Sequence, residues 1–438
     1  MHIRSKLVED ICGWTALAPG LTPYRSLDAD ATADCVVIGA GFTGLAIARR
    51  LAELRPEARV VLVDAKRVTG GASSRNSGFA VANEGPGHAQ LHTEQGRASY
   101  FTMNRIDRFG VSSLRDLVQQ HGIEAQWEDT PSIHAAHDPR NYQRLQRHLD
   151  AFQQLGINAR LVEGPELKTR LGTDFYGLGV ETSGGALLQP AMMAQGLAAH
   201  LPRSVEVFEN TAISSLRHLD GGWAMTANGH TLRAQQVFVA VNAFFPRLGL
   251  KQRRVFPLAL TASLTRPLKP EEERAIGNPA SWGILSPRSL GATMRLTCDR
   301  RLLIRNTAEF LAGGVRPDAL AARKRQHAVG LRKRFAFLDE GDIDFTWSGT
   351  ICISRNGKPV FEENQPGLYL CGGYNASGVS RGTAMGRLIA EYATGQDSER
   401  LSDALNLIKP TRLPPRPFLD LGVKARVWME RQAAAKER

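Results

Sequence analysis

The sequence predicts an α/β protein with a Rossmann-type nucleotide-binding domain and a second domain built on a mixed β-sheet. Three observations support this fold class. Residues 34–65 place a glycine-rich turn and an amphipathic segment between two short apolar runs. Residues 367–395 repeat the order of apolar run, glycine-rich turn and helical segment. Between these units, short apolar runs separated by glycine turns indicate several β-strands.

The first unit has the length of one βαβ unit, about 30 residues. "CVVIGA" (35–40) is β-branched and apolar, which predicts a buried strand, and "ARVVLVDA" (58–65) predicts a second one. Between them, "GLAIARRLAEL" (44–54) has the spacing of a helix with one apolar face. That face consists of Leu45, Ala48, Leu51 and Ala52.

The turn of this unit carries Gly39, Gly41 and Gly44 in G-x-G-x-x-G spacing. Gly39 permits a tight turn, Gly41 lets a pyrophosphate approach the backbone, and Gly44 lets the helix pack closely on the strand. The helix N-terminus offers free N–H groups and a partial positive charge to phosphates. Asp64 ends the second strand about 20 residues later, where a carboxylate can accept hydrogen bonds from ribose hydroxyls. The unit therefore predicts a dinucleotide site.

The loop "GGASSRNSGFA" (70–80) directly follows the second strand and favours a flavin over a nicotinamide. A loop of small residues can follow the diphosphate, the ribityl chain and the ring of a flavin with its backbone amides. Arg75 adds a positive fork. The alternative is a mobile surface loop that tolerates small residues. The short donors and acceptors of this loop are Ser73, Ser74, Asn76 and Ser77.

The second glycine-rich unit predicts a strand at "LYLC" (368–371), a turn at "GGYNASG" (372–378) and a helix that starts near Val379. Leu388, Ile389 and Tyr392 are expected to face a core. The N-terminus of this helix can point at the cofactor. Its partial positive charge would stabilise the reduced, anionic flavin ring.

Residues 11–400 resemble the D-amino-acid oxidase/sarcosine oxidase superfamily of FAD-dependent oxidoreductases. "VVIGAGFTGL…VVLVDA…GGASSRNSG" is similar to its N-terminal signature, and "GGYNASGVSRGT" to its C-terminal flavin loop. "VFVAVNAFFPRL" (237–248) resembles its strand-plus-Asn element near the adenine. "FTWSGTICISRNGKPVF" (345–361) is similar to its W-x-G…G-x-P element. "CGWTALAP" and "MRLTCDRRLLIRN" (294–306) resemble the γ-glutamylputrescine oxidase-like branch.

The resemblance implies a glutathione-reductase-like FAD-binding domain and bound FAD. The family acid at the ribose is usually Glu, where this chain has the shorter Asp64. Neither family position for covalent attachment carries its linking residue: the first loop has Arg75 and Asn76 in place of a histidine, and Gly349 stands in place of a cysteine. FAD is therefore expected to be non-covalent. Cofactor contacts are expected at Gly39, Gly41, Phe42, Thr43, Gly44, Asp64, Ala65, Lys66, Gly71, Ala72, Ser73, Arg75, Asn76, Ser77, Gly78, Ile213, Asn242, Gly349, Gly373, Gly378, Val379 and Ser380.

The motif order implies a discontinuous FAD-binding domain. Its segments are 30–118, 188–245 and 347–400, and the substrate domain comprises 119–187 and 246–346. In the tail, 401–438, prolines at 410, 414, 415 and 417 block regular structure, and the residues after them predict a short basic helix. Leu421, Ala425 and Trp428 share one side of that helix, and we expect this side to pack on its own domain or on a partner subunit. A membrane-surface helix is the alternative.

The expected reaction is oxidation of a C–N bond in a small amine or amino acid. Hydride passes from carbon to flavin N5, the imine hydrolyses, and O2 or a quinone or other electron carrier then takes the electrons. Arg295 or Arg305 could bind a substrate carboxylate, the alternative for each being a surface or salt-bridged arginine. Residues expected beside the ring are Arg75, Tyr374 and Asn375.

Composition excludes several function classes. The net charge is +12, but it is dispersed over small clusters, which favours solvated surfaces and an anion-lined site over a nucleic-acid groove. No apolar run approaches the about 18 residues of a membrane span. His88 and His92 have metal-ligand spacing without a third ligand, so no metal is expected.

The five cysteines form no C-x-x-C pair and predict reduced thiols and a cytoplasmic location, with Cys352 and Cys371 packed inside the protein. Two other functions stay open at this level. One is a flavin dehydrogenase at the inner face of a membrane, held there by the tail, which passes electrons to a quinone or carrier. The other is a flavoprotein that acts on nucleic acid.

Overall fold

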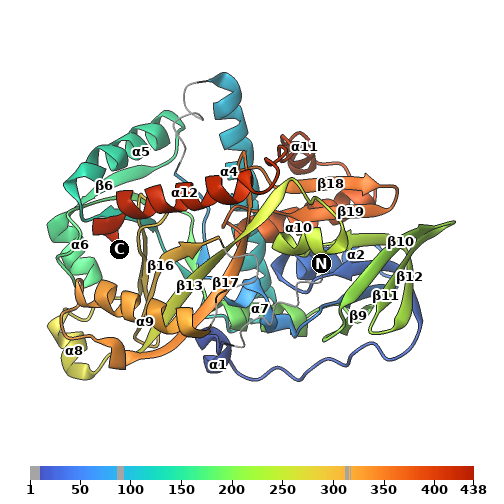
Figure 1. Ribbon diagram of the computed structural model, residues 1–438, viewed down its shortest axis with the longest axis horizontal. Helices are drawn as coiled ribbons and strands as arrows, with labels where there is room; N and C mark the ends of the chain where they lie inside the picture. The colour runs from blue at the N-terminus through green and yellow to red at the C-terminus, as the bar shows by residue number, and fades with distance from the viewer. Residues whose placement is uncertain (1–9, 86–92, 311–314, 316) are drawn as a thin grey trace.

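Two eight-stranded sheets organise the molecule, one toward the right and one toward the left of the view in Figure 1. The computed structural model describes residues 10–85, 93–310, 315 and 317–438. A three-stranded sheet of β3 (Phe79–Ala80), β8 (Ala186–Leu187) and β4 (Glu128–Asp129) lies between distant segments of the chain. The expected combination of a Rossmann-type domain and a mixed sheet is confirmed.

The first sheet has the order β10-β11-β12-β1-β2-β9, with β19 on β12 and β18 on β19. Its centre is parallel, because β1 runs parallel to β2 and β12, and β12 runs parallel to β19. Central parallel strands are covered on both faces, which is why β2 reads as the unbroken apolar run "VVLV" and is buried throughout. Its strands are β1 (Ala31–Ile38), β2 (Val60–Val63), β9 (Val205–Phe208), β10 (Ile213–Leu219), β11 (Gly222–Ala227), β12 (His230–Val239), β18 (Val360–Gln365) and β19 (Leu368–Gly372).

Helices α2 (Phe42–Leu54), α10 (Ser380–Ala393) and α4 (Glu94–His121) pack closely against one another beside the first sheet. Glycines permit these close approaches. A Cβ on Gly386 of α10 would lie 2.5 Å from the Thr43 carbonyl of α2, and a Cβ on Gly110 of α4 would collide with the Ser380 carbonyl. The start of α10 is thereby held against both α2 and α4. Helices α7 (Pro190–Ala199) and α11 (Glu399–Leu405) also belong to this side of the molecule.

The second sheet has the order β17-β13-β16-β15-β14-β5-β7-β6 and is antiparallel except for the β14–β5 pair. Helix α9 (Pro317–Arg332) packs on β13, β16 and β17, and α5 (Tyr142–Gln154) packs on the β5–β7–β6 end. The sheet consists of β5 (Ser132–Ala136), β6 (Ala159–Glu163), β7 (Leu178–Thr182), β13 (Val255–Pro267), β14 (Trp282–Leu285), β15 (Thr293–Leu296), β16 (Arg301–Glu309) and β17 (Ile343–Ser354).

Strand pairing corrects the expected domain division in one segment. The sequence assigns 347–354 to the FAD-binding domain, but these residues belong to β17, which pairs with β13 along the second sheet. Alternate side chains of a strand point to opposite faces. Trp347 can therefore donate to Arg75 O in residues 70–80, called the Gly/Ser loop below, while its own backbone belongs to the second sheet. The other boundaries of the division remain predictions.

The tail forms α12 (Phe418–Ala433), which crosses the front of the molecule in Figure 1. The expectation that its apolar side packs on its own domain is wrong, because Leu421 and Trp428 are 63% and 62% exposed, whereas packing on a partner subunit stays a prediction. The helix docks instead through its other face, where Val427 and Ala434 meet Leu290 and Ala308.

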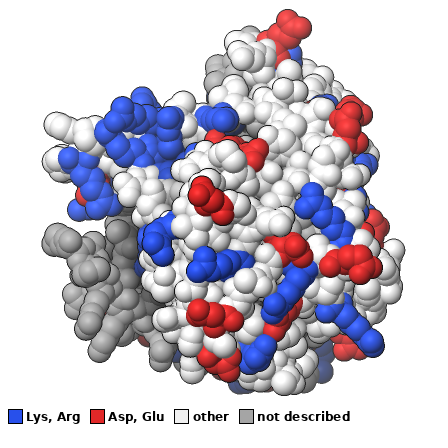
Figure 2. All heavy atoms as spheres, turned by 90° about the vertical axis from the view of Figure 1, so that its right-hand side faces the viewer, with Lys and Arg blue, Asp and Glu red and all other residues white. Residues whose placement is uncertain are grey.

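Within the described residues, no helix is both long enough and apolar enough to cross a membrane. On the face shown in Figure 2, Lys and Arg alternate with Asp and Glu over most of the surface and gather at the upper left edge.

Candidate functional site

The turn between β1 and α2 has glycines where the backbone leaves no room for a side chain. Gly39 has φ +106°, and a Cβ on it would lie 2.8 Å from the Ala240 carbonyl of the neighbouring strand end. A Cβ on Gly44 would collide with the Gly39 carbonyl. Both glycines are therefore explained by close backbone approach around the start of α2.

The N-terminus of α2 is ready to bind an acceptor. Gly41 is its N-cap and offers no side-chain cap. The hydroxyl of Ser73, from the Gly/Ser loop, accepts a hydrogen bond from Phe42 N at 2.9 Å. A Cβ on Gly41 would lie 2.7 Å from the same oxygen. The other N–H groups of this first turn and its partial positive charge suit the oxygen of a phosphate, so the start of α2 fits the diphosphate of a dinucleotide.

Asp64 lies beyond the end of β2, beside the glycine turn. Its Oδ2 accepts from Ala40 N and its Oδ1 accepts from Lys66 N, each at 2.8 Å. Burial raises the pKa of this carboxyl above its usual range. A carboxylate oxygen can accept more than one hydrogen bond, so the pair of backbone bonds orients Asp64 and leaves acceptor capacity for ribose hydroxyls.

Side chains from α1 (Gly13–Leu17), the residue before it and β17 hold the Gly/Ser loop by hydrogen bonds to its carbonyls. Three consecutive carbonyls of the loop accept hydrogen bonds, which does not fit the alternative of a mobile surface loop. The pairs are Cys12 Sγ to Ser74 O, Trp14 Nε1 to Asn76 O and Trp347 Nε1 to Arg75 O, at 3.2, 2.8 and 3.2 Å. Two of the donors come from α1 and the residue before it. No local pattern in the sequence indicates this role of the "CGW" motif, because the donors and the acceptors are more than 60 positions apart.

The same loop leaves open space beside Gly71. A Cβ at this position would meet nothing within 4 Å, and its φ of −100° is ordinary for any residue. Gly349 of β17 lies on the other side of the loop, where a Cβ would approach the Arg75 carbonyl at 3.4 Å. The glycine turn, the start of α2, Asp64 and this open-faced glycine together fit an extended dinucleotide.

The second glycine loop is held in a left-handed conformation. Gly373, Asn375 and Ala376 have φ values of +74°, +52° and +85°. Asn242 Oδ1 accepts from Gly373 N at 3.0 Å, and Asn375 Nδ2 donates to Gly373 O at 2.9 Å. A left-handed alanine costs on the order of 1 kcal/mol or more, and such strain concentrates at functional sites. Asn242 thus joins the end of the first sheet to this loop.

Arg381, on the first turn of α10, fixes the second loop from behind, and sequence analysis did not single it out. Its NH1 donates to Tyr374 O at 3.1 Å. Its Nε and NH2 donate to the two oxygens of Asp107 on α4, at 2.9 and 2.6 Å, and both side chains are at most 3% exposed. The two residues are 274 positions apart, so no local pattern indicates the pair.

Two residues expected beside the flavin ring form structural bonds. The hydroxyl of Tyr374 is 2.8 Å from Thr43 Oγ1 and joins the second loop to α2. Arg75 donates to Asp10 Oδ1 at 2.5 Å and to Ser348 O at 2.9 Å. The positive fork expected at Arg75 is therefore paired with a buried carboxylate upstream of the first strand, and its place beside the flavin ring stays a prediction.

Arg295 and Arg305 come from neighbouring strands and lie on the same face of the second sheet, since Thr293 pairs with Arg305 and Arg295 pairs with Leu303. Arg295 is 0% exposed, and its NH1 donates to Leu188 O at 2.5 Å and to Gly78 O at 3.3 Å. Through the bond to Gly78 O, the face of the second sheet that carries both arginines lies against the Gly/Ser loop. The surface alternative is wrong for Arg295.

Neither arginine is neutralised by an acid. Arg305 NH2 donates to Thr293 Oγ1 at 2.6 Å, and Arg295 has Nε and NH2 atoms without a partner within the described part of the chain. The hydrogen bonds of both arginines in that part of the chain go to carbonyl and hydroxyl oxygens, not to carboxylates. Burial lowers the pKa of each guanidinium to about 10. Two desolvated cations on one face favour binding of an anionic group.

The structure places the remaining residues that the sequence singled out, except His88 and His92. Cys352 and Cys371 are each 1% exposed, and burial raises the pKa of each thiol to about 12, so both are packed as expected. Ile213 begins β10 and packs on the apolar cluster around that strand. His88 and His92 lie outside the described residues. Among the described residues, no three metal-ligating side chains come together.

Comparison with known proteins shows which family this chain belongs to. The sequence profile of the family "FAD dependent oxidoreductase" matches residues 34–392. The Haemophilus influenzae protein named "Probable oxidoreductase OrdL" is 27% identical over 399 residues, which are 90% of each chain. Gamma-glutamylputrescine oxidoreductase of Escherichia coli is 26% identical over 401 residues, covering 90% of this chain and 91% of that protein. The crystal structure of glycine oxidase from Geobacillus kaustophilus superposes with a TM-score of 0.67 at 19% identity, covering 84% of this chain and 96% of that one.

Proposed function

Because the chain belongs to the family of FAD dependent oxidoreductases, we propose that it oxidises a C–N bond of an amine or amino acid that carries a carboxylate. The observation that carries this proposal is the pair Arg295 and Arg305 on the sheet face that meets the Gly/Ser loop. The similar proteins named above act, by their names, on γ-glutamylputrescine and on glycine, which also favours a C–N substrate.

The residues around α2 would hold the cofactor. FAD, when bound, supplies the acceptor for a hydride from the carbon next to nitrogen. The first turn of α2 and Ser73 would bind the diphosphate, and Asp64 the ribose. The N-terminus of α10, which Val379 leaves without a side-chain cap, would place its partial positive charge at the other glycine loop. We propose that the other residues expected from the sequence to contact the cofactor also line its binding site.

The two arginines would have different tasks. Arg305 is partly exposed and anchored at one nitrogen by Thr293, which leaves its other donors for a substrate carboxylate. Arg295 is enclosed, and its bonds to Leu188 O and Gly78 O make it a positioning residue between substrate and loop. The resulting imine would be hydrolysed by water, without a protein acid–base pair.

The test is anaerobic mixing of the holoenzyme with a panel of amines and amino acids, read by loss of visible flavin absorbance. Reduction by at least one amine that bears a carboxylate, and none by the corresponding carboxylates without nitrogen, is the expected result. A flavin that no amine or amino acid reduces, but that an alcohol or hydroxy acid does, would contradict the proposal.

The flavin would be bound non-covalently, since Cys352 is buried and Gly349 stands at the family's linking position. Acid precipitation should therefore release all of the yellow colour into the supernatant. Colour that stays in the washed pellet would show a covalent bond.

A second candidate function is a dehydrogenase that passes electrons to a quinone or carrier at a membrane. The exposed apolar side chains of α12 favour it. Reoxidation of the reduced flavin by O2 and by a soluble quinone analogue, measured side by side, separates the two candidates: faster reoxidation by the quinone supports the dehydrogenase.

A further inference from the structure

Helix α12 turns its apolar side chains to solvent. Phe418, Leu421, Trp428 and Met429 are 67%, 63%, 62% and 50% exposed. They recur at intervals of three, seven and one, so they share one face of the helix, with Ala425 between them. Large apolar side chains gathered on one face mark an interaction surface.

The helix cannot turn this face inward, because its other face and its end are fixed. Val427 and Ala434 pack on Ala308 of the second sheet. Beyond the helix, the buried carboxylate of Glu437 accepts hydrogen bonds from three donors. These are His137 N, Asp138 N and Asn141 Nδ2, at 2.9, 3.0 and 2.7 Å.

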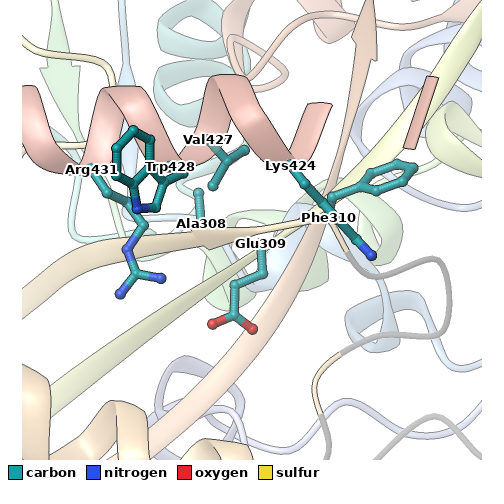
Figure 3. A pocket seen from close by; sticks show the side chains of 7 residues that line it. All are labelled: Ala308, Glu309, Phe310, Lys424, Val427, Trp428 and Arg431. Atoms are coloured by element: carbon teal, nitrogen blue, oxygen red, sulfur yellow. The ribbon is translucent and has the colours of Figure 1, made fainter. Parts of the chain in front are cut away.

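Figure 3 shows the inner edge of this helix, where Lys424, Trp428 and Arg431 line a cavity of about 240 Å³. Glu309, the last residue of β16, and Phe310 after it lie opposite. Trp428 thus lies at the border between the docked side and the outward face. Trp and Phe on the apolar face are typical of helices that lie in a membrane interface.

The charges of α12 are sorted by sign. Its acids are paired along the helix: Asp420 with Arg416 at 3.3 Å, and Glu430 with Arg426 at 2.7 Å. The exposed charges beside the apolar face are basic, namely Lys424 and Arg426, which is 72% exposed although one of its nitrogens pairs with Glu430. Two copies of this face would bring like charges together with no unpaired acid to meet them. The complement of this surface is therefore anionic.

We propose that the outward face of α12 docks the protein peripherally on an anionic lipid surface. The four apolar side chains enter the boundary between headgroups and acyl chains, and Lys424 and Arg426 contact anionic headgroups. The helix has 16 residues and lies along the surface. This docking does not depend on which amine the enzyme oxidises.

The test is co-sedimentation of the FAD-loaded protein with vesicles of phosphatidylcholine alone and of phosphatidylcholine mixed with phosphatidylglycerol. Binding should be at least about tenfold stronger to the mixed vesicles and should weaken at high salt. Phe418→Ser/Trp428→Ser should lower it about tenfold or more, while Trp428→Phe retains it. Lys424→Gln/Arg426→Gln should remove most of the salt dependence.

The matched control is Val329→Ser/Phe337→Ser, which removes two exposed apolar side chains, 58% and 38% exposed, away from α12. It should bind vesicles like the wild type, and all variants should keep the wild-type FAD content. Equal binding to both vesicle types, or binding unchanged in Phe418→Ser/Trp428→Ser, would overturn the proposal. A wild-type dimer that becomes a monomer in that variant would also overturn it and assign the face to a second copy of the chain.

Discussion

The two large sheets prepare their sites with different parts of the chain. At the first sheet most of the site is backbone, namely the glycines at 39 and 44, the N–H groups at the start of α2 and the anchored Gly/Ser loop, with Asp64 and Ser73 as the side-chain contributors. At the second sheet they come from side chains, above all Arg295 and Arg305. A cofactor shared by a family suits fixed backbone geometry, whereas a substrate that differs between relatives suits side chains that can be exchanged.

The buried arginines Arg381 and Arg295 show the same division. Beside the first sheet, Arg381 pairs with Asp107 and holds the second glycine loop through Tyr374 O. In the second sheet, Arg295 keeps its Nε and NH2 atoms without a partner within the described residues. Unsatisfied buried groups cost stability, so they are retained where a ligand completes them or where function requires them.

The sharpest test of this contrast replaces one buried arginine on each side. Arg381→Met leaves Asp107 buried and unpaired, and should lower the free energy of unfolding by about 3–5 kcal/mol. Arg295→Met removes two hydrogen bonds to carbonyls and leaves no buried acid without its partner. It should therefore lower the free energy of unfolding by only about 1–2 kcal/mol. Denaturant unfolding of both variants measures the difference. Equal losses would mean that the two sides do not differ in this way.

The backbone character of the cofactor site is tested by Gly71→Val. The new side chain meets no protein atom within 4 Å, so the fold should be unaffected, but FAD affinity should fall about tenfold to hundredfold through contact with the cofactor. Gly20→Val is the matched control, since it also opens onto empty space. FAD titration of the apoprotein gives the affinities. Wild-type affinity in Gly71→Val would show that the cofactor does not pass this loop.

The side-chain character of the substrate site is tested by Arg305→Lys. Lysine keeps the charge but loses the fork, so KM for a substrate with a carboxylate should rise about tenfold while FAD content stays unchanged. An amine substrate without the carboxylate should be affected far less. If both substrates lose the same factor, Arg305 acts on the fold and not on the carboxylate.

The free energy of unfolding should also depend on pH through His327 of α9, which packs on the second sheet. Burial first, and then Arg438, Arg305 and Arg323, lower the pKa of His327 to about 3. The unfolded chain binds a proton near pH 6.5 that the folded chain refuses, so stability is complete above that pH and falls as pH drops below it. His327 alone should cost about 1 kcal/mol between pH 6.5 and 5.5.

Thermal unfolding at both pH values tests this expectation. His327→Gln should unfold with a smaller acid shift than the wild type, and His218→Gln, on the exposed side of β10, should behave like the wild type. A His327→Gln variant that is as acid-sensitive as the wild type would place the acid sensitivity elsewhere.

Sequence alone determined the local units of this protein. The spacing of Gly39, Gly41 and Gly44 between two apolar runs predicts a βαβ unit, because each part of it depends on residues a few positions apart. The second loop could be predicted for the same reason, whereas the mixed second sheet was expected from the family resemblance and the motif order. The resemblance to a family then indicated FAD, which the family match supports.

Only the tertiary structure decided what those units contact. Asp10 pairs with Arg75, and Asp107 pairs with Arg381 across 274 positions, so neither partner is visible in a local pattern. The pattern of β17 cannot show which sheet will hold its backbone, since one face of the strand contacts the loop of the other sheet. Helix α12 has an evident apolar side, but its direction depends on Glu437 and Val427, which anchor the opposite face. Periodicity defines a face, and only packing determines what that face meets.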